Sequence, residues 1–219
     1  MTRTTDIKHH LTDQLLIAYA AGSLPEAFDL VVATHVSLCD ECRARLAEFE
    51  AVGGEVLEFT EEAPVSDAAL DATLQLISNA AWSEPSPSVV KRDSIFPAPL
   101  QAYAGPGPDA VKWRRIGGGV RQKVLHTDGK ATVRLLHIPA GCAVPDHGHN
   151  GTELTLVLQG AFRDEDDRFG VGDVEVANED LEHTPVAEPG EDCICLAACD
   201  APLAFKGLMH RIAGRVIGI

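Results

Sequence analysis

The amino-acid sequence predicts a two-domain protein, an all-α N-terminal module followed by an all-β C-terminal barrel. Three observations support this fold class. In residues 1–84 the apolar side chains recur at helical spacing, and no β-type alternation appears. Residues 85–108 are rich in proline and glycine without periodicity, which is typical of a linker. Residues 109–219 contain short alternating runs separated by turn sequences, a pattern that predicts an all-β domain.

Four short helices are expected in residues 1–84. Thr12 is a suitable N-cap for the first helix, and Gly22 is a suitable end. Pro25 suits the first turn of the second helix, and the third is expected over about residues 39–50. The fourth begins near residue 66 and carries one apolar stripe, formed by Leu70, Leu74, Ile77 and Ala81. This stripe either packs within the module or docks on a partner protein.

The C-terminal half contains five runs that read as strands. Turn signals such as Asp128-Gly129 and Asn150-Gly151 lie between them. Many short strands at near-regular spacing predict a barrel or sandwich. The runs are Val120–His126, Ala131–Ile138, Glu153–Gln159, Val174–Ala177 and Cys193–Ala198.

Charge and composition limit the classes of partner. The net charge is −15, and residues 1–90 hold 15 acidic and 4 basic side chains, a formal charge of −11. Such a half repels nucleic acid directly and favours a basic partner. The longest apolar run, Leu15 to Ala21, is too short for a membrane span, and residues 1–8 do not resemble a signal peptide. We therefore expect a cytoplasmic protein, and six scattered cysteines fit a reducing compartment.

The first half carries a set of metal ligands that contains sulfur. His35 and Cys39 are four residues apart, so on a helix they share one face, and Cys42 follows after two residues. Zinc requires four such ligands in a closed structural site. His10 is the best fourth ligand, with His9 as the alternative. Because four short helices bury little apolar surface, we expect zinc binding to supply much of the stability of this module.

The second half carries a different set, with nitrogen and oxygen donors alone. His147 and His149 are two residues apart, and Glu153 has the same strand parity. His183 can return on a neighbouring strand and complete the set. Three imidazoles and one carboxylate suit zinc, manganese, iron or nickel, and the ligands alone do not choose between them.

Residues Gly141 to Gly160 resemble the first cupin motif at every fixed position, and Gly172-Asp173 with His183 resemble part of the second. A cupin double-stranded β-barrel is therefore expected over residues 109–219. The helical His-(x3)-Cys-(x2)-Cys module joined to a cupin resembles the ChrR-type anti-sigma factors over nearly the whole chain. That resemblance implies a regulator that binds an extracytoplasmic-function sigma factor through its zinc module and releases it on oxidative signals such as singlet oxygen. It also implies two metal sites, with the ligands His10, His35, Cys39 and Cys42 in the module and His147, His149, Glu153 and His183 in the cupin.

Two other functions fit the second ligand set. A metal-dependent cupin enzyme, a dioxygenase or isomerase, would use an open metal position, but the sequence offers no separate nucleophile. A small-molecule-binding regulator is the third possibility. Cys142, Cys193 and Cys195 are candidate oxidisable thiols, although a small buried apolar side chain is the favoured interpretation of each. We expect no catalytic residues.

Overall fold

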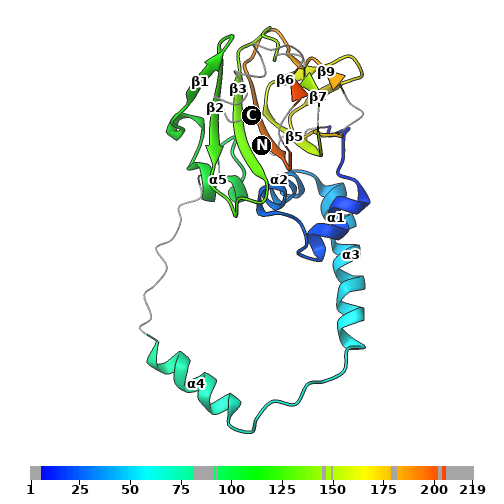
Figure 1. Cartoon of the computed structure of the whole chain (residues 1–219), viewed down its shortest axis with the longest axis vertical. Helices are drawn as coiled ribbons and strands as arrows, with labels where there is room; N and C mark the ends of the chain where they lie inside the picture. The colour runs from blue at the N-terminus through cyan, green and yellow to red at the C-terminus, as the bar shows by residue number, and fades with distance from the viewer. Residues whose placement is uncertain are drawn as a thin grey trace.

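The computed structural model describes residues 6–80, 91, 93–144, 147–148, 150–178, 182–201 and 204–205. An N-terminal helical part is followed by an all-β part (Figure 1), as the sequence predicts. The helices are α1 (Asp13–Ala20), α2 (Glu26–Val36), α3 (Asp40–Glu58), α4 (Ala69–Asn79) and α5 (Ala98–Ala104). The strands are β1 (Arg114–Gly117), β2 (Val120–Leu125), β3 (Thr132–Ile138), β4 (His147–Gly148), β5 (Glu153–Gln159), β6 (Ala161–Arg163), β7 (Arg168–Gly170), β8 (Val174–Ala177), β9 (Glu182–His183), β10 (Val186–Ala187), β11 (Cys193–Cys199) and β12 (Ala204–Phe205).

The helix ends follow local capping chemistry. Thr12 Oγ1 accepts a hydrogen bond from the Leu15 amide at the start of α1, and Gly22 takes a positive φ of 62° just after its end. The N-cap of α3 is Cys39, whose Sγ accepts from the backbone amide of Cys42. Helix α3 continues beyond the expected residue 50 to Glu58, because internal glycines weaken a helix by only about 1 kcal/mol each and do not end it.

The described strands form three antiparallel sheets. The largest has the order β1-β2-β3-β11-β5-β8, and the smaller ones are β10-β6-β7 and β12-β4-β9. Strands far apart in sequence are neighbours in the large sheet, since β11 lies between β3 and β5. This topology agrees with the predicted all-β barrel.

The large sheet lies between two apolar cores. On one face, Leu156 and Leu196 pack with Val31 of α2 and Leu16 of α1. The core on the other face lies between the large sheet and the β10-β6-β7 sheet. It contains Val157, Cys193 and Cys195 of the large sheet, packed with Phe162 of β6 and Phe169 of β7. Alternate residues of β5 and β11 thus point to opposite cores, and the strands are buried on both sides. The helical part does not bury a core alone; it shares one with the barrel.

Part of the predicted linker is folded. Helix α5 lies within residues 85–108, and its Leu100 is fully buried with Phe96 in the core shared by the helices and the sheet. Pro97 is the N-cap of this helix, where its fixed φ and missing N–H are tolerated. The high proline content predicts a linker over residues 85–108. In the structure, residues 95–104 of this stretch cover one face of the large sheet. Residues 81–90 lie outside the described part of the chain.

Helix α4 lies apart from the barrel and from the other helices, and the outer part of α3 extends away from the barrel (Figure 1). None of the residues of α4 is buried. Leu70, Leu74 and Ile77 of the predicted stripe are therefore exposed, rather than packed within the module as one of the two sequence interpretations had it. Ala81, the fourth residue of that stripe, lies outside the described residues. No helix in the described part of the chain is long and apolar enough to cross a membrane.

Candidate metal centres

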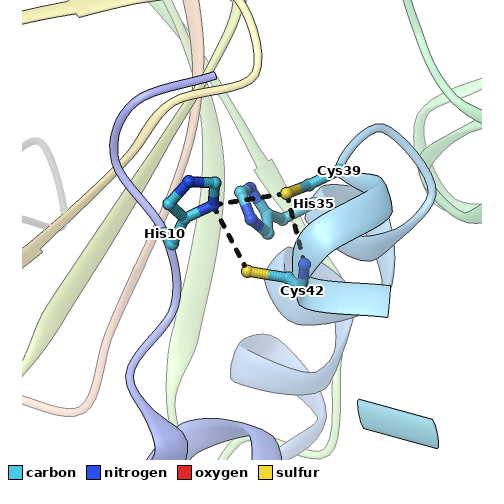
Figure 2. Close-up of side chains that lie close together, drawn as sticks. All are labelled: His10, His35, Cys39 and Cys42. Atoms are coloured by element: carbon cyan, nitrogen blue, oxygen red, sulfur yellow. Dashed lines mark hydrogen bonds between the residues drawn. The ribbon is translucent and has the colours of Figure 1, made fainter. Parts of the chain in front are cut away.

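Four side chains with nitrogen or sulfur donors converge where the N-terminal segment meets α2 and α3 (Figure 2). They are His10, His35, Cys39 and Cys42, and one donor atom of each lies within 4.8 Å of the others. His10 Nδ1 is 3.3 Å from Cys39 Sγ and 3.7 Å from Cys42 Sγ. A tetrahedral ion with metal–nitrogen bonds of about 2.0 Å and metal–sulfur bonds of about 2.3 Å separates these atoms by about 3.5 Å. The four donors fit such an ion.

The ring of His35 is oriented as a metal ligand would be. Its Nδ1 lies 3.0 Å from the carbonyl oxygen of Gly172, so Nδ1–H donates to that oxygen. Its Nε2 is buried without a hydrogen-bond partner in the described part of the chain. Burial lowers the pKa of His35 to about 4, because the charged ring would lose its hydration. The neutral ring therefore carries its lone pair on Nε2, which is the form that binds metals.

The structure distinguishes His10 from its neighbour. His10 turns its other nitrogen, Nε2, toward the Glu41 carboxylate at 3.4 Å, an arrangement common for metal-bound histidines. His9 faces the barrel instead. Its Nε2 is 3.0 Å from Asp167 Oδ2, and its ring lies 4.3 Å from the ring of Phe169. Of the two histidines, His10 is the one that joins the cluster.

The two thiols of the cluster, Cys39 and Cys42, are both buried. Burial raises the pKa of Cys42 to about 11, so the thiol stays protonated at neutral pH when no cation is near. A thiol binds metal as thiolate, and a divalent ion supplies the charge that favours this form. The cluster is therefore suited to a cation.

A second cluster lies inside the barrel and contains Asp164, Glu175 and His183. His183 Nδ1 is 3.0 Å from Glu175 Oε1 and 3.3 Å from Asp164 Oδ2. Burial raises the pKa of Glu175 to about 7. Burial lowers the pKa of His183, but the hydrogen bond to Glu175 and its charge outweigh this and raise it to about 9. Since the carboxylates hold the proton on Nδ1, Nε2 is the nitrogen that a metal would use.

The structure places part of the ligand set predicted for the barrel. His147 in β4 pairs directly with His183 in β9, so these two positions are neighbours. Glu153 begins β5, is buried, and accepts a hydrogen bond from Thr155 Oγ1 at 3.0 Å. The side chain of His147 is not described, and His149 lies outside the described residues. The four-ligand set therefore stays a prediction.

Comparison with known proteins decides the family. The family described as ChrR cupin-like domain matches residues 105–201. The anti-sigma-E factor ChrR of Cereibacter sphaeroides is 56% identical over 206 residues, which cover 94% of this chain and 96% of the relative. The chain belongs to the ChrR family. A crystal structure of Rhodobacter sphaeroides SigE in complex with the anti-sigma ChrR also matches, with a TM-score of 0.77, 57% identity, and 88% of this chain and 98% of that chain covered. The resemblance read from the sequence is thus confirmed.

Two residues of the barrel cluster in this ChrR-family chain, Asp164 and Glu175, were not predicted from the sequence. Glu175 is a single carboxylate in the short apolar strand β8, three residues after Gly172. A lone carboxylate in such a strand indicates a functional side chain, and this feature could have identified it. Asp164 belongs to an acidic run, residues 164–167, that reads as a solvated turn. Only the tertiary structure brings it to His183.

Two of the three candidate thiols of the ChrR-family barrel are buried away from solvent. Cys193 and Cys195 are buried, with their sulfur atoms 3.4 Å apart. The hydrogen bond between them, together with burial, raises the pKa of Cys195 well above its usual range. Such a group is a thiol at neutral pH, and thiols react with oxidants far more slowly than thiolates do. Cys142 is half-buried.

Proposed function

We propose that this protein is an anti-sigma factor that binds and sequesters an extracytoplasmic-function sigma factor through its helical module. The observation that carries the proposal is the 56% identity, over 94% of the chain, to a relative named anti-sigma-E factor. The crystal structure of ChrR in complex with SigE supports the same type of partner. The protein would act in the cytoplasm, where sigma factors bind RNA polymerase, and as a regulator rather than as an enzyme.

The surface that would contact the sigma factor is formed by α4 and the outer part of α3. A free apolar surface of this kind is typical of a protein interface. Residues 1–90 carry a formal charge of −11, with 15 acidic and 4 basic side chains, which complements a partner whose basic surfaces hold DNA. The exposed large apolar side chains of α3 and α4 are Val52, Val56, Leu57, Leu70, Leu74, Leu76 and Ile77, and the exposed Phe59 follows directly after α3.

We assign zinc to the helical cluster of His10, His35, Cys39 and Cys42. Two thiolates and two imidazoles in a tetrahedral arrangement are typical of structural zinc sites. The ion would fix α2 and α3 relative to the segment before α1, so that α3 leaves the barrel in a defined direction toward the partner.

The barrel would hold a second ion, zinc or another divalent metal such as manganese, iron or nickel, with the ligands His147, His149, Glu153 and His183. We propose that oxidative stress, for example singlet oxygen, alters this site and leads to release of the sigma factor. Support comes from the Asp164 and Glu175 carboxylates, which lie against His183 Nδ1 and orient its ring, as carboxylates commonly do for metal-bound histidines.

Glu175→Gln tests the barrel site. Glutamine keeps the size of the side chain and removes the charge that holds the proton on His183 Nδ1, so barrel metal affinity should fall about 10–100-fold. Chelator competition on the full-length chain measures this loss against a control, Glu191→Gln, which alters an exposed carboxylate in the turn before β11. Equal metal affinity in Glu175→Gln and the wild type would contradict the role of Glu175.

Co-expression with a candidate sigma factor tests the main proposal. The two chains should co-elute as a stable complex, and transcription from the promoter of that sigma factor should fall when this protein is present. If neither occurs with any extracytoplasmic-function sigma factor of the same genome, the anti-sigma function is wrong. Metal-dependent uptake of dioxygen would favour the enzyme interpretation, and ligand-dependent stabilisation of the barrel would favour the small-molecule interpretation.

A further inference from the structure

One buried carboxylate of the barrel holds the N-terminal segment in place. Asp173 lies in the turn before β8, and its Oδ1 accepts hydrogen bonds from the backbone amides of Lys8 at 2.7 Å and His9 at 3.0 Å. Its Oδ2 accepts from the amide of Gly170 at 2.8 Å. The Val174 amide donates to the carbonyl oxygen of His9 at 3.3 Å, which extends the contact by one residue. The segment is thus attached to the barrel by its backbone, in addition to the contacts of the His9 side chain with Asp167 and Phe169.

The same turn contacts the helical cluster at a second point. The carbonyl oxygen of Gly172 accepts from His35 Nδ1 at 3.0 Å, and His10 follows directly after His9 in the chain. The turn is itself fixed to β5, because the Gly172 amide donates to Val157 O at 2.9 Å. The same barrel turn therefore contacts both His35 and the N-terminal segment that leads into His10.

The bonds to Asp173 are of the strong kind. A buried carboxylate that accepts several backbone amides forms charge-assisted hydrogen bonds, which are shorter and stronger than neutral ones. Removing the carboxylate leaves these amides without their acceptor, which favours departure of the segment into water. The position of His10 next to Cys39 and Cys42 then depends on a residue that lies 163 positions later in the chain.

We propose that Asp173 is a positioning residue of the helical metal centre, because it presents His10 to the other three ligands. The inference rests on the proposed metal at this cluster. It implies that metal affinity at the cluster and attachment of the N-terminal segment to the barrel are linked, and the linkage is reciprocal. Each event favours the other by the same factor.

The linkage gives the barrel a direct physical route to the helical module. Asp173 is two residues from Glu175, which faces His183 in the barrel cluster. A rearrangement of β8 caused by a change in that cluster would displace Asp173 and loosen the segment that carries His10. The metal of the helical module would then be held by three protein ligands, with weaker affinity.

The test is Asp173→Ala in the full-length chain. Cobalt(II) bound by Cys39 and Cys42 gives a thiolate charge-transfer absorption, so titration of this band with zinc reports the affinity of the sulfur-containing site alone. We expect Asp173→Ala to bind zinc about 10–100-fold more weakly than the wild type, the usual loss when a supporting residue of a metal site is removed.

Asp192→Ala is the matched control. Asp192 is also a barrel aspartate that accepts a backbone amide, that of Ala140 at 3.0 Å, and its described contacts do not include the N-terminal segment. Its zinc affinity at the sulfur-containing site should equal that of the wild type. Equal affinity in Asp173→Ala would overturn the positioning role and leave the metal assignment intact. Absence of the band in the wild type would overturn both.

Hydrogen exchange on the wild type provides a measurement that does not require the variant to fold. Removal of zinc should accelerate exchange of the Lys8 and His9 amides, by which the segment donates to Asp173. The amide of Ala140, which donates to Asp192, serves as the internal control. Unchanged exchange at the Lys8 and His9 amides after zinc removal would overturn the linkage.

Discussion

Replacing both Cys39 and Cys42 with serine should release the metal of the helical module and unfold α1–α3. Zinc sites in small peptides supply about 10–16 kcal/mol of apparent binding energy, whereas a whole domain is stable by only about 5–15 kcal/mol. We therefore expect a large loss of helical circular dichroism and of sigma-factor binding.

The barrel should remain folded in this variant, because its second core lies between the large and small sheets and contains no helical residues. It should melt at a lower temperature than in the wild type, since one face of the large sheet becomes exposed. Cys142→Ser is the control, as Cys142 is a cysteine outside the cluster. Unchanged helical dichroism and melting temperature in the double variant would show that the module folds without metal.

The double substitution Leu74→Glu and Ile77→Glu should abolish sigma-factor binding and leave the fold intact. These side chains are 53% and 66% exposed, so their replacement removes no core packing. Apolar residues central to an interface each contribute about 2 kcal/mol or more. Two such losses amount to an affinity decrease on the order of 1,000-fold. Calorimetric or surface-based titration with the purified sigma factor measures the decrease.

A variant with Ala72→Glu and Gln75→Glu controls for added charge. Both residues are exposed on α4, away from the stripe formed by Leu70, Leu74 and Ile77. The control introduces two carboxylates on the same helix and should bind with nearly wild-type affinity. Undiminished binding of the Leu74 and Ile77 variant would exclude this stripe from the interface.

The helical part and the barrel share one apolar core. The sequence predicts two domains joined by a linker, because helical spacing in residues 1–84 gives way to strand alternation in residues 109–219. Yet Phe96 and Leu100, within the predicted linker, are buried with helical and strand residues in one core. A module of four short helices is too small to bury its own apolar surface, so α1 and α2 use the barrel as their support. The exposed α4 is the part of the module that this support does not cover.

The fold class and the helical cluster of histidines and cysteines were predictable because both follow local rules. Thr12 caps α1 and Cys39 caps α3, and the alternation in β5 sends Leu156 to one core and Val157 to the other. The spacing of His35, Cys39 and Cys42 follows the geometry of one helix and its neighbour. The addition of His10 followed from its position before α1, and the structure brings it within 3.3 Å of Cys39.

The barrel cluster was less predictable, because its members are adjacent only in three dimensions. Asp164 and His183 are distant in sequence, and an acidic turn gives no local sign that one carboxylate is buried.

The sequence by itself determined the order of an all-α part and an all-β part, because periodicity and caps act over a few residues. It also determined the spacing of His35, Cys39 and Cys42, which lie together in the structure. Only the tertiary structure decided that the helices share a core with the barrel and that Asp173 holds the segment before His10. Contacts of this kind join residues more than 150 positions apart, and chain packing, which no local pattern encodes, selects them.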